Sequence, residues 1–266
     1  MSKPEQRRQS ILALLKQKGR VSVQDIVSQL NCSEATARRD LDALSQTEPV
    51  IRTIGGAVYD ALLTPREASF EEKTAILWAE KERIAAKAAS LVAEGDIIGL
   101  TGGTTTFLIA RQLKARKGIT VVTNALNIAM ELADNEDLQV VVVGGVLRHK
   151  SYELSGPLAE KVIESINIGT MFLGIDGISL EKGLTTHSES EAQTAKLLMK
   201  RAERTVAVFD RSKVGRVSLF TIAPVREASA CITDAPLDEA LRKQLEQQGV
   251  CIYEAERTLV DEEPDA

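Results

Sequence analysis

The chain has 266 residues, 44% of them hydrophobic, which is long enough for a small domain followed by a larger one. Aromatic residues make up only 3%, which argues against recognition of single-stranded nucleic acid by base stacking. Three scattered cysteines and two histidines lack metal-ligand spacing, so we expect no disulfide framework and no metal site. Without a signal peptide or an apolar run near ~18 residues, we expect a cytoplasmic protein with no membrane span.

The net charge of −5 is distributed unevenly along the chain. Residues 1–59 carry nine Lys/Arg against six Asp/Glu, a net charge of +3. The remaining residues carry 24 against 32, a net charge of −8. A basic head on an acidic body favours a DNA-binding segment joined to a domain with another task.

The N-terminal sequence predicts three short helices. The first covers residues 5–18 and ends at Gly19, and the second covers residues 21–30, where Ser22 can serve as its N-cap. A tight turn then leads to Ser33, which can cap a third helix reaching residue 44. Two helices joined by a short turn, with basic groups on the second, indicate a helix-turn-helix.

The third helix is predicted to bury one face through apolar residues at i, i+4 and i+7. Thr36 and Arg39 point away from that stripe, and Arg38 lies on its flank. Such a helix suits a DNA major groove, where arginine reaches base edges or phosphates. The alternative is a surface helix with an Arg38–Asp42 ion pair at i, i+4.

After Pro49, residues 50–59 predict a hairpin that turns near Gly55-Gly56 and completes a winged helix-turn-helix. Arg52 on this wing can reach phosphate or the minor groove, although the glycines alone fit a simple structural turn. The candidate DNA contacts are Ser22, Ser33, Glu34, Thr36, Arg38, Arg39 and Arg52.

Beyond a linker, a helix over residues 80–93 precedes repeated strand–loop–helix units, which predict an open, mostly parallel α/β sheet. The run over 140–143 is continuously β-branched, which predicts burial on both faces. The expected strands cover 96–100, 119–122, 140–143, 171–175, 205–209, 230–233 and 250–253. The expected helices among them cover 107–114, 128–133 and 190–202.

The sharpest motif of the larger domain is the run Gly102, Gly103, Thr104, Thr105 and Thr106, directly after a predicted strand. Two glycines let backbone N–H groups approach an anion, three hydroxyls add donors, and a helix N-terminus follows. The run matches neither a Walker loop nor G-x-G-x-x-G, so no nucleotide or other cofactor is inferred. The alternative is a tight turn with hydroxyl caps.

Other polar loops also follow predicted strands, where open α/β sheets bind ligands. Glu189, Gln193 and Lys196 fall along one side of a helix, which fits either sugar-phosphate recognition or a solvated face. His187 alone is more often structural than catalytic. Residues 150–157 either line the pocket or form an oligomer contact. Added to the glycine–threonine run, the effector candidates are Thr123, Asn124, Gly145, Asp176, Thr186, Glu189, Lys196 and Lys213.

These motifs resemble the DeoR family of bacterial sugar-metabolism repressors. The head carries S-x-x-T-x-R-R-D-L-x-x-L and R-T-x-G-G-A, with Ile54 where a histidine is expected. The larger part carries T-G-G-T-T-T, V-T-N, V-V-G-G, G-I-D-G, T-H-S-E-x-E-A and F-D-R-S-K. The resemblance implies a winged helix-turn-helix head at 3–58, a linker at 59–79, a sensor domain at 80–254 similar in fold to ribose-5-phosphate isomerase, and an acidic tail at 255–266.

The resemblance further implies a repressor of a carbohydrate-utilisation operon, which binds double-stranded operator DNA and is released from it by a phosphorylated sugar or related metabolite. It also implies assembly as a homodimer or homotetramer. The main alternative is a sugar-phosphate isomerase-like enzyme with an accessory DNA-binding head, in which Asp176, Glu189 and Glu191 do acid–base work. An activator built from the same parts is a third possibility.

Overall fold

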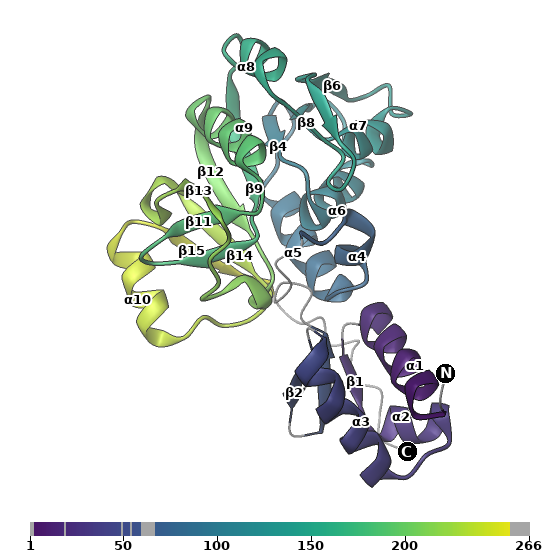
Figure 1. Cartoon of the computed structure of the whole chain (residues 1–266). Coiled ribbons are helices and arrows are strands. Elements are labelled where there is room, and N and C mark those ends of the chain that lie inside the picture. Colours follow the sequence, from purple (N-terminus) through teal and green to yellow (C-terminus); the bar gives the residue numbers. More distant parts are fainter. Residues whose placement is uncertain (1–2, 19, 49, 54, 60–66, 256–266) are drawn as a thin grey trace. The chain divides into compact units, whose positions relative to one another are not determined.

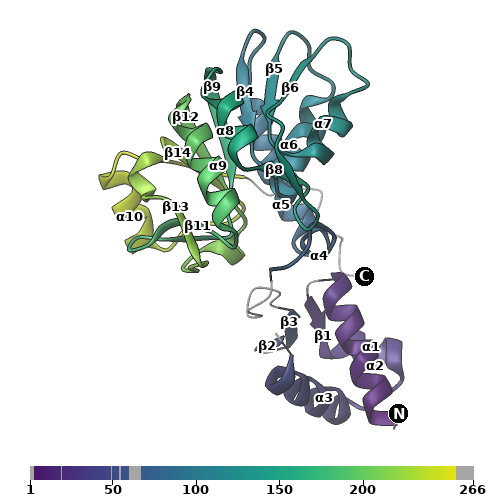
Figure 2. The same ribbon diagram turned by 45° about the horizontal axis from the view of Figure 1, so that its top comes forward.

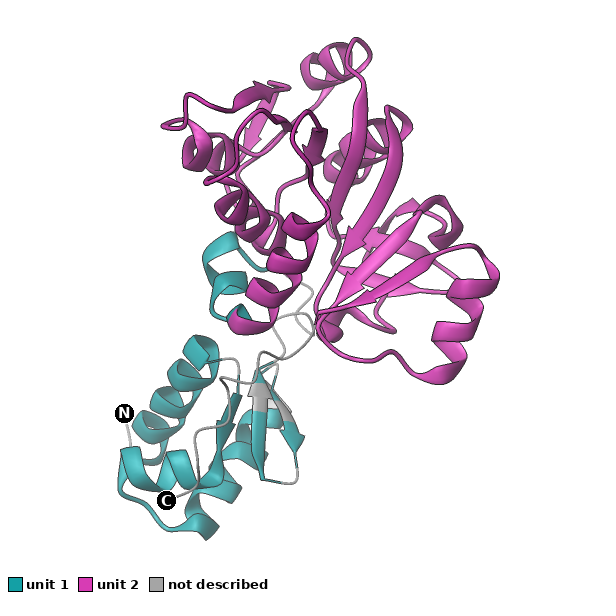
Figure 3. Cartoon of the chain, turned by 180° about the vertical axis from the view of Figure 1, so that it is seen from behind, with its two compact units in different colours: residues 1–78 teal, residues 79–266 magenta. Residues whose placement is uncertain are grey.

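The computed structural model describes residues 3–18, 20–48, 50–53, 55–59 and 67–255. The chain divides into two compact units, residues 1–78 and 79–266 (Figure 3). The predicted linker overlaps this division: a short helix, α4 (Phe70–Thr74), precedes the boundary, and residues 60–66 lie outside the described residues. Most of the predicted acidic tail lies outside them as well.

The first unit is a winged helix-turn-helix, as predicted (Figure 1). A core of fully buried side chains, including Ile11, Leu15, Ile26 and Leu41, joins its helices. The wing has three antiparallel strands in the order β1-β3-β2. Its elements are α1 (Lys3–Lys18), β1 (Arg20–Ser22), α2 (Val23–Leu30), α3 (Glu34–Thr47), β2 (Val50–Thr53) and β3 (Gly56–Tyr59).

Strand β1 was not expected, because residues 21–30 were predicted as one helix. The helix begins only at Val23, and Ser22 is its N-cap in a capping box with Asp25, as the sequence allows. Val21 instead pairs with Ala57 of β3. A Cβ at the neighbouring Gly56 would lie 2.1 Å from the Val21 carbonyl oxygen, so only glycine lets the two strands approach.

The second unit is built on a seven-stranded parallel sheet in the order β15-β14-β12-β9-β4-β5-β6, which confirms the predicted fold class. Helices α6 and α7 pack together on one side of the sheet, and α8 and α9 on the other (Figures 1 and 2). The strands are β4 (Ile97–Leu100), β5 (Thr120–Thr123), β6 (Gln139–Val142), β9 (Ile168–Gly174), β12 (Ala202–Val208), β14 (Ala230–Thr233) and β15 (Cys251–Glu254). The helices are α5 (Trp78–Ser90), α6 (Thr104–Leu113), α7 (Leu126–Leu132), α8 (Pro157–Ile163), α9 (Glu189–Lys200) and α10 (Glu239–Gln247).

Two smaller sheets were not anticipated. The first is a hairpin of β7 (Val146–Arg148) and β8 (Glu153–Ser155). It includes most of residues 150–157, which the sequence predicts either to line the pocket or to form an oligomer contact. A second antiparallel sheet has the order β10-β11-β13, from β10 (Gly177–Ser179), β11 (Gly183–Thr186) and β13 (Phe220–Ala223). Short 3-10 turns cover Arg211–Lys213 and Val225–Glu227.

The prediction that residues 140–143 are buried on both faces is wrong for 140–142 of the single chain, whereas Val143, just after β6, is fully buried. Strand β6 is the edge of the sheet, with Val140 and Val141 half-buried and Val142 39% exposed. A β-branched run reports strand propensity, and it does not report whether the strand is central or at an edge. No helix within the described ranges is long and apolar enough to span a membrane.

The strand order also marks where a ligand would bind. From β4 the chain continues to β5 and β6 on one side, whereas β9, β12, β14 and β15 extend the other. The switch point therefore lies between β4 and β9, and crevices at such points, outside the carboxyl ends of strands, hold ligands in open α/β sheets. The loops after these two strands contain the predicted glycine–threonine run and Asp176.

Candidate functional site

The first candidate surface is helix α3 of the head. Ser33 caps the helix, and its hydroxyl lies 2.8 Å from that of Thr36. Arg38 and Arg39 are exposed on the following turn, and Glu34, also exposed, approaches Arg38 at 3.6 Å. An exposed pair at this distance contributes little stability, so the guanidinium can exchange it for a phosphate or base.

Arg52 has a structural partner. Its Nε donates to Asp42 Oδ1 at 2.7 Å, and its guanidinium also donates to the Gly56 carbonyl. This arrangement ties the wing to α3 and gives Asp42 a partner other than the Arg38 weighed from the sequence. Ser22 caps α2 and is half-buried, so it lies on a different helix from the arginines.

One feature of the head, an ion pair between α1 and α3, was not predicted from the sequence. Asp40, between the exposed Arg39 and the buried Leu41, is only 6% exposed and forms an ion pair with Arg7 of α1. A buried carboxylate with an arginine partner fixes α3 against α1 more specifically than apolar contacts alone. The only signal in the sequence is an acidic residue on the apolar side of the predicted helix.

The second candidate site begins at the switch point. Thr101 Oγ1 accepts a hydrogen bond from the Gly174 backbone at 3.0 Å, which joins the ends of β4 and β9. Gly103, at φ +124°, is the N-cap of α6. The helix begins at Thr104, earlier than predicted, so the three buried threonines form its first turn, and Thr106 Oγ1 donates to the Gly103 carbonyl at 3.0 Å. The backbone N–H groups in the first turn of a helix at this edge of the sheet are suited to bind an anion.

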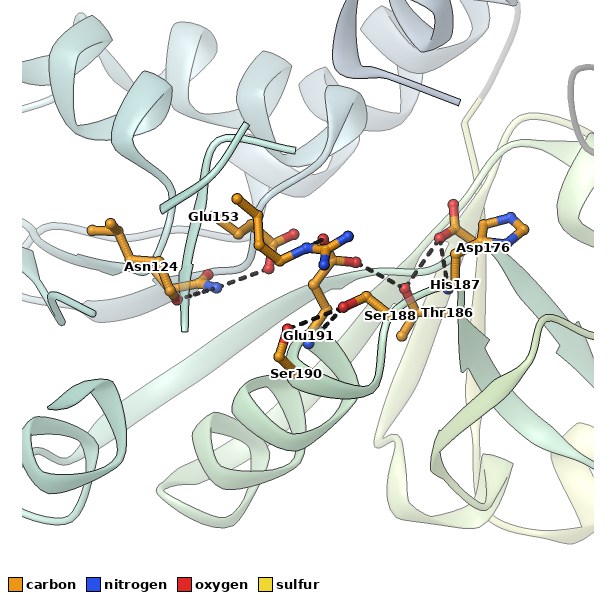
Figure 4. Close-up of polar contacts among 10 residues, drawn as sticks. Asn124, Glu153, Asp176, Thr186, His187, Ser188, Ser190 and Glu191 are labelled. Carbon is orange, nitrogen blue, oxygen red and sulfur yellow. Dashed lines mark hydrogen bonds and ion pairs between the residues drawn. The ribbon is translucent and has the colours of Figure 1, made fainter. Parts of the chain in front are cut away.

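The β7–β8 hairpin lies directly against this loop through Glu153. A Cβ added to Gly102 would lie 2.2 Å from Glu153 Cγ, so the side chain packs on the glycine itself. Asn124, after β5, donates from Nδ2 to Glu153 Oε2 at 2.8 Å (Figure 4). Asn124 is fully buried, and its Oδ1 has no hydrogen-bond partner within the described part of the chain.

A chain of buried and half-buried polar groups connects the hairpin to β11 and α9. Arg148 of β7 donates to Glu191 Oε1 at 3.1 Å. Thr186 Oγ1 lies 3.2 Å from Glu191 Oε2 and 3.1 Å from Asp176 Oδ2, and the backbone of His187 donates to the same Asp176 oxygen at 3.4 Å (Figure 4). The structure thus brings the predicted Asp176 and Thr186 together, and adds two groups that were not among the effector candidates.

The three residues of α9 that the sequence singled out do not join this cluster. Glu189, Gln193 and Lys196 are exposed, whereas Glu191 is buried on the opposite side. Helical periodicity correctly placed the three on one side, but could not tell which side packs on the sheet. The solvated-face alternative describes where these side chains lie.

The other candidates hold the scaffold around the loop. Thr123 Oγ1 donates to the Leu100 carbonyl at 2.8 Å and accepts from the Ala125 backbone at 3.0 Å, which fixes β5 beside β4. Gly145, at φ +120°, packs against the backbone of Ser155, where a Cβ would lie 2.7 Å from the carbonyl oxygen. Both residues position the segments on which Asn124 and the hairpin are carried.

A separate charged cluster follows β12. Burial alone would raise the pKa of Asp210, but the positive charges of Lys213 and Lys81, with hydrogen bonds from Ser212, lower it below its usual value. The predicted Lys213 therefore lies beside a buried carboxylate. Arg211 pairs with Asp234 after β14 at 2.6 Å. Among the described residues no group of His, Cys, Asp and Glu is arranged to hold a metal ion.

Comparison with known proteins identifies both units. The profile of the DeoR-like helix-turn-helix domain matches residues 7–61, and that of the DeoR C-terminal sensor domain matches residues 78–235. The HTH-type transcriptional regulator GlpR of Haloferax volcanii is 36% identical, over 94% of this chain and 98% of that protein. The glycerol-3-phosphate regulon repressor of Escherichia coli K12 is 31% identical, over 88% and 92%.

A putative aga operon transcriptional repressor of Escherichia coli O157:H7 is 36% identical, over 90% of each chain. Among solved structures, ribose 5-phosphate isomerase A of Methanocaldococcus jannaschii aligns with a TM-score of 0.40 and 19% identity, over 52% of this chain and 55% of that one.

Proposed function

Because this chain belongs to the DeoR family of transcriptional regulators, we propose that it represses a carbohydrate-utilisation operon and leaves the DNA when a phosphorylated sugar or related metabolite binds. The observation that carries the proposal is the pairing of a winged helix-turn-helix with a glycine–threonine turn at a switch point, where a helix N-terminus suits an anion. The proposal puts the protein in the cytoplasm, with its operator.

Helix α3 is the proposed reader of the DNA major groove. Arg38, Arg39 and Thr36 are the proposed base or phosphate contacts, and the exposure of both arginines supports this role. Arg52 donates hydrogen bonds to Asp42 and to the Gly56 carbonyl. We propose that it either gives up these contacts to reach DNA or acts indirectly, by holding the wing against α3. Ser22, Ser33 and Glu34 stay secondary candidates for phosphate contacts at helix ends.

The loop of Gly102, Gly103 and Thr104 is the proposed phosphate site, with Asn124, Asp176 and Thr186 beside the sugar hydroxyls. The buried Asn124 Oδ1 supports this assignment, because an acceptor that has no partner among the described residues fits a donor on a ligand. Lys213 is proposed to act at the edge of the site, beside Asp210. The exposure of Glu189 and Lys196 gives them no support as effector contacts in this conformation.

We propose a homodimer or homotetramer as the working form. Two heads are needed to read two operator half-sites, and a closed symmetric dimer places them at a fixed spacing. Large apolar side chains are exposed around the β6 edge, including Met130 at 67% and Val146 at 68%. Exposed apolar residues beside an open edge strand favour burial in an interface between copies.

We propose that the protein is a sensor and not an enzyme, because a sensor needs different affinities for its two states and does not need turnover. An assay for aldose–ketose interconversion of ribose 5-phosphate and hexosamine phosphates checks the isomerase alternative, and steady turnover would overturn this part of the proposal.

The main test titrates the protein with DNA upstream of its own gene at fixed salt, with and without a panel of sugar phosphates. Salt is fixed because phosphate contacts make affinity strongly dependent on ionic strength. We expect one compound to release the DNA in the wild type and to bind Arg39→Ala with unchanged affinity. DNA binding that no sugar phosphate alters contradicts the sensor assignment, and a compound that strengthens DNA binding indicates an activator.

A further inference from the structure

Helix α3, the proposed reader of the DNA, carries a charged residue on its buried side. Ala37, Leu41 and Leu44 form the buried apolar stripe of this helix. Asp40 completes the i, i+3, i+4, i+7 pattern of the stripe and is only 6% exposed. A carboxylate therefore occupies a position where an amphipathic helix normally buries an apolar side chain.

The partner of this carboxylate belongs to another helix. Arg7 of α1 is half-buried, and its Nε donates a hydrogen bond to Asp40 Oδ2. Ile11 and Leu15 of α1 lie in the same hydrophobic core as Leu41 of α3. The two helices are therefore joined by apolar contacts and by one charge-assisted hydrogen bond.

These two kinds of contact constrain α3 differently. Apolar burial has no directional requirement, whereas the guanidinium N–H must point at the carboxylate oxygen. The ion pair therefore restrains the rotation of α3 about its own axis. A rotation of about 20° would move a group ~6 Å from the axis by about 2 Å, which is enough to break a hydrogen bond to a base edge.

Stability alone does not explain a buried ion pair at this place. Apolar residues of similar volume usually stabilise a protein as well as a buried ion pair or better, because the two charges must be desolvated. A buried pair can instead select one arrangement of the elements that it joins. Arg39 directly precedes Asp40 in the chain, so the angle fixed at Asp40 also sets the direction of the exposed Arg38 and Arg39.

We propose that the Arg7–Asp40 ion pair is a positioning element for operator recognition, which fixes the rotation of α3 so that Arg38 and Arg39 meet the correct bases. The inference rests on the proposed function, because it assumes that α3 reads the major groove. It assigns discrimination between DNA sequences, and not affinity for DNA in general, to a pair of residues that lies on the buried side of the helix.

The test measures discrimination as the ratio of the affinities for a selected and an unrelated DNA duplex. The wild-type full-length chain selects the first duplex from a random library, and fluorescence anisotropy at fixed salt gives both affinities. In Arg7→Met with Asp40→Leu, apolar groups replace both charges, so we expect a melting temperature no lower than that of the wild type. We expect about tenfold weaker binding of the selected duplex, through the loss of about one base contact, and unchanged binding of the unrelated duplex.

Two further variants separate position from stability. Asp40→Asn keeps the shape of the side chain and removes its charge, and should lower both the melting temperature and the discrimination. The double variant should recover the melting temperature without recovering the discrimination. Lys117→Met with Asp137→Leu removes an exposed ion pair of the second unit, and should change neither quantity.

Wild-type discrimination in the double variant overturns the proposal, because the pair would then act only through the stability of the head. If the double variant does not fold, Asp40→Asn decides at a temperature where circular dichroism shows it folded, and unchanged discrimination there also overturns the proposal. If the wild type selects no sequence, the proposed function fails together with this inference. If it selects a sequence that no sugar phosphate releases, only the sensor assignment fails.

Discussion

Gly102→Ala tests whether Glu153 limits the space above the proposed anion-binding loop. The added Cβ would lie 2.2 Å from Glu153 Cγ, about 1.2 Å inside an ordinary contact of ~3.4 Å, and Cγ is not the free end of the side chain. The shift that this overlap forces costs about 1–3 kcal/mol, as overpacking does in buried sites. For a unit the size of residues 79–266, that corresponds to a fall in melting temperature of about 2–12 °C.

The test compares the cost of Gly102→Ala in two backgrounds by thermal unfolding of the full-length chain. In Glu153→Ala the space is empty, so the added methyl group should cost close to nothing. Gly55→Ala, where nothing lies within 4 Å of the new Cβ, is the control in the wild type. An equal cost of Gly102→Ala in both backgrounds would refute the reasoning, because some group other than Glu153 would then limit the site.

The remaining predictions concern the head and the cysteines. Arg39→Ala should weaken operator binding and make the slope of log K against log salt concentration shallower by about one. DNA titration at several salt concentrations measures this slope. A loss of effector affinity as well would contradict separate roles for the two units. Hydrogen bonds from the Ser22 hydroxyl and backbone lower the pKa of Asp25, so its stabilisation is present above its unfolded pKa and lost as the pH falls through the folded value. Asp25→Ala should therefore cost about 1 kcal/mol in urea unfolding at pH 7 and progressively less in acid, and a cost independent of pH would contradict this. At pH 8 a thiol reagent should label exposed Cys251 in the folded chain and spare Cys231, whose burial raises its pKa to about 12, with mass spectrometry of the labelled peptides as the measurement.

The head could be predicted almost completely because its signals are local. Ser22 and Ser33 cap the helices as expected, and apolar spacing identified the buried side of α3. What could not be predicted depends on pairing across the chain. Strand β1 has only three residues and forms by pairing with β3, and the Arg7–Asp40 ion pair joins residues 33 positions apart.

The parallel sheet was predictable as a class, but its strand order was not. Alternating strand and helix signals indicate parallel pairing, whereas the order that puts β9 beside β4 and leaves β6 at an edge follows from packing of the whole unit. For the same reason the sequence could not decide between its two interpretations of the α9 face: periodicity defines a stripe, and the neighbouring elements decide whether that stripe is buried.

The proposed sensor site combines residues of the regular parallel sheet with residues of the short β7–β8 hairpin. The proposed anion-binding loop, Gly102–Thr106, follows a strand of the regular sheet, where a glycine pair after a strand is visible in the sequence. Glu153 and Arg148 belong to a hairpin with strands of three residues, too short for any periodicity, and its turn includes Tyr152 at φ +59°. If the loop binds the anion as proposed, the hairpin beside it is the segment that can distinguish one ester from another, and its substitutions should change which ester is recognised.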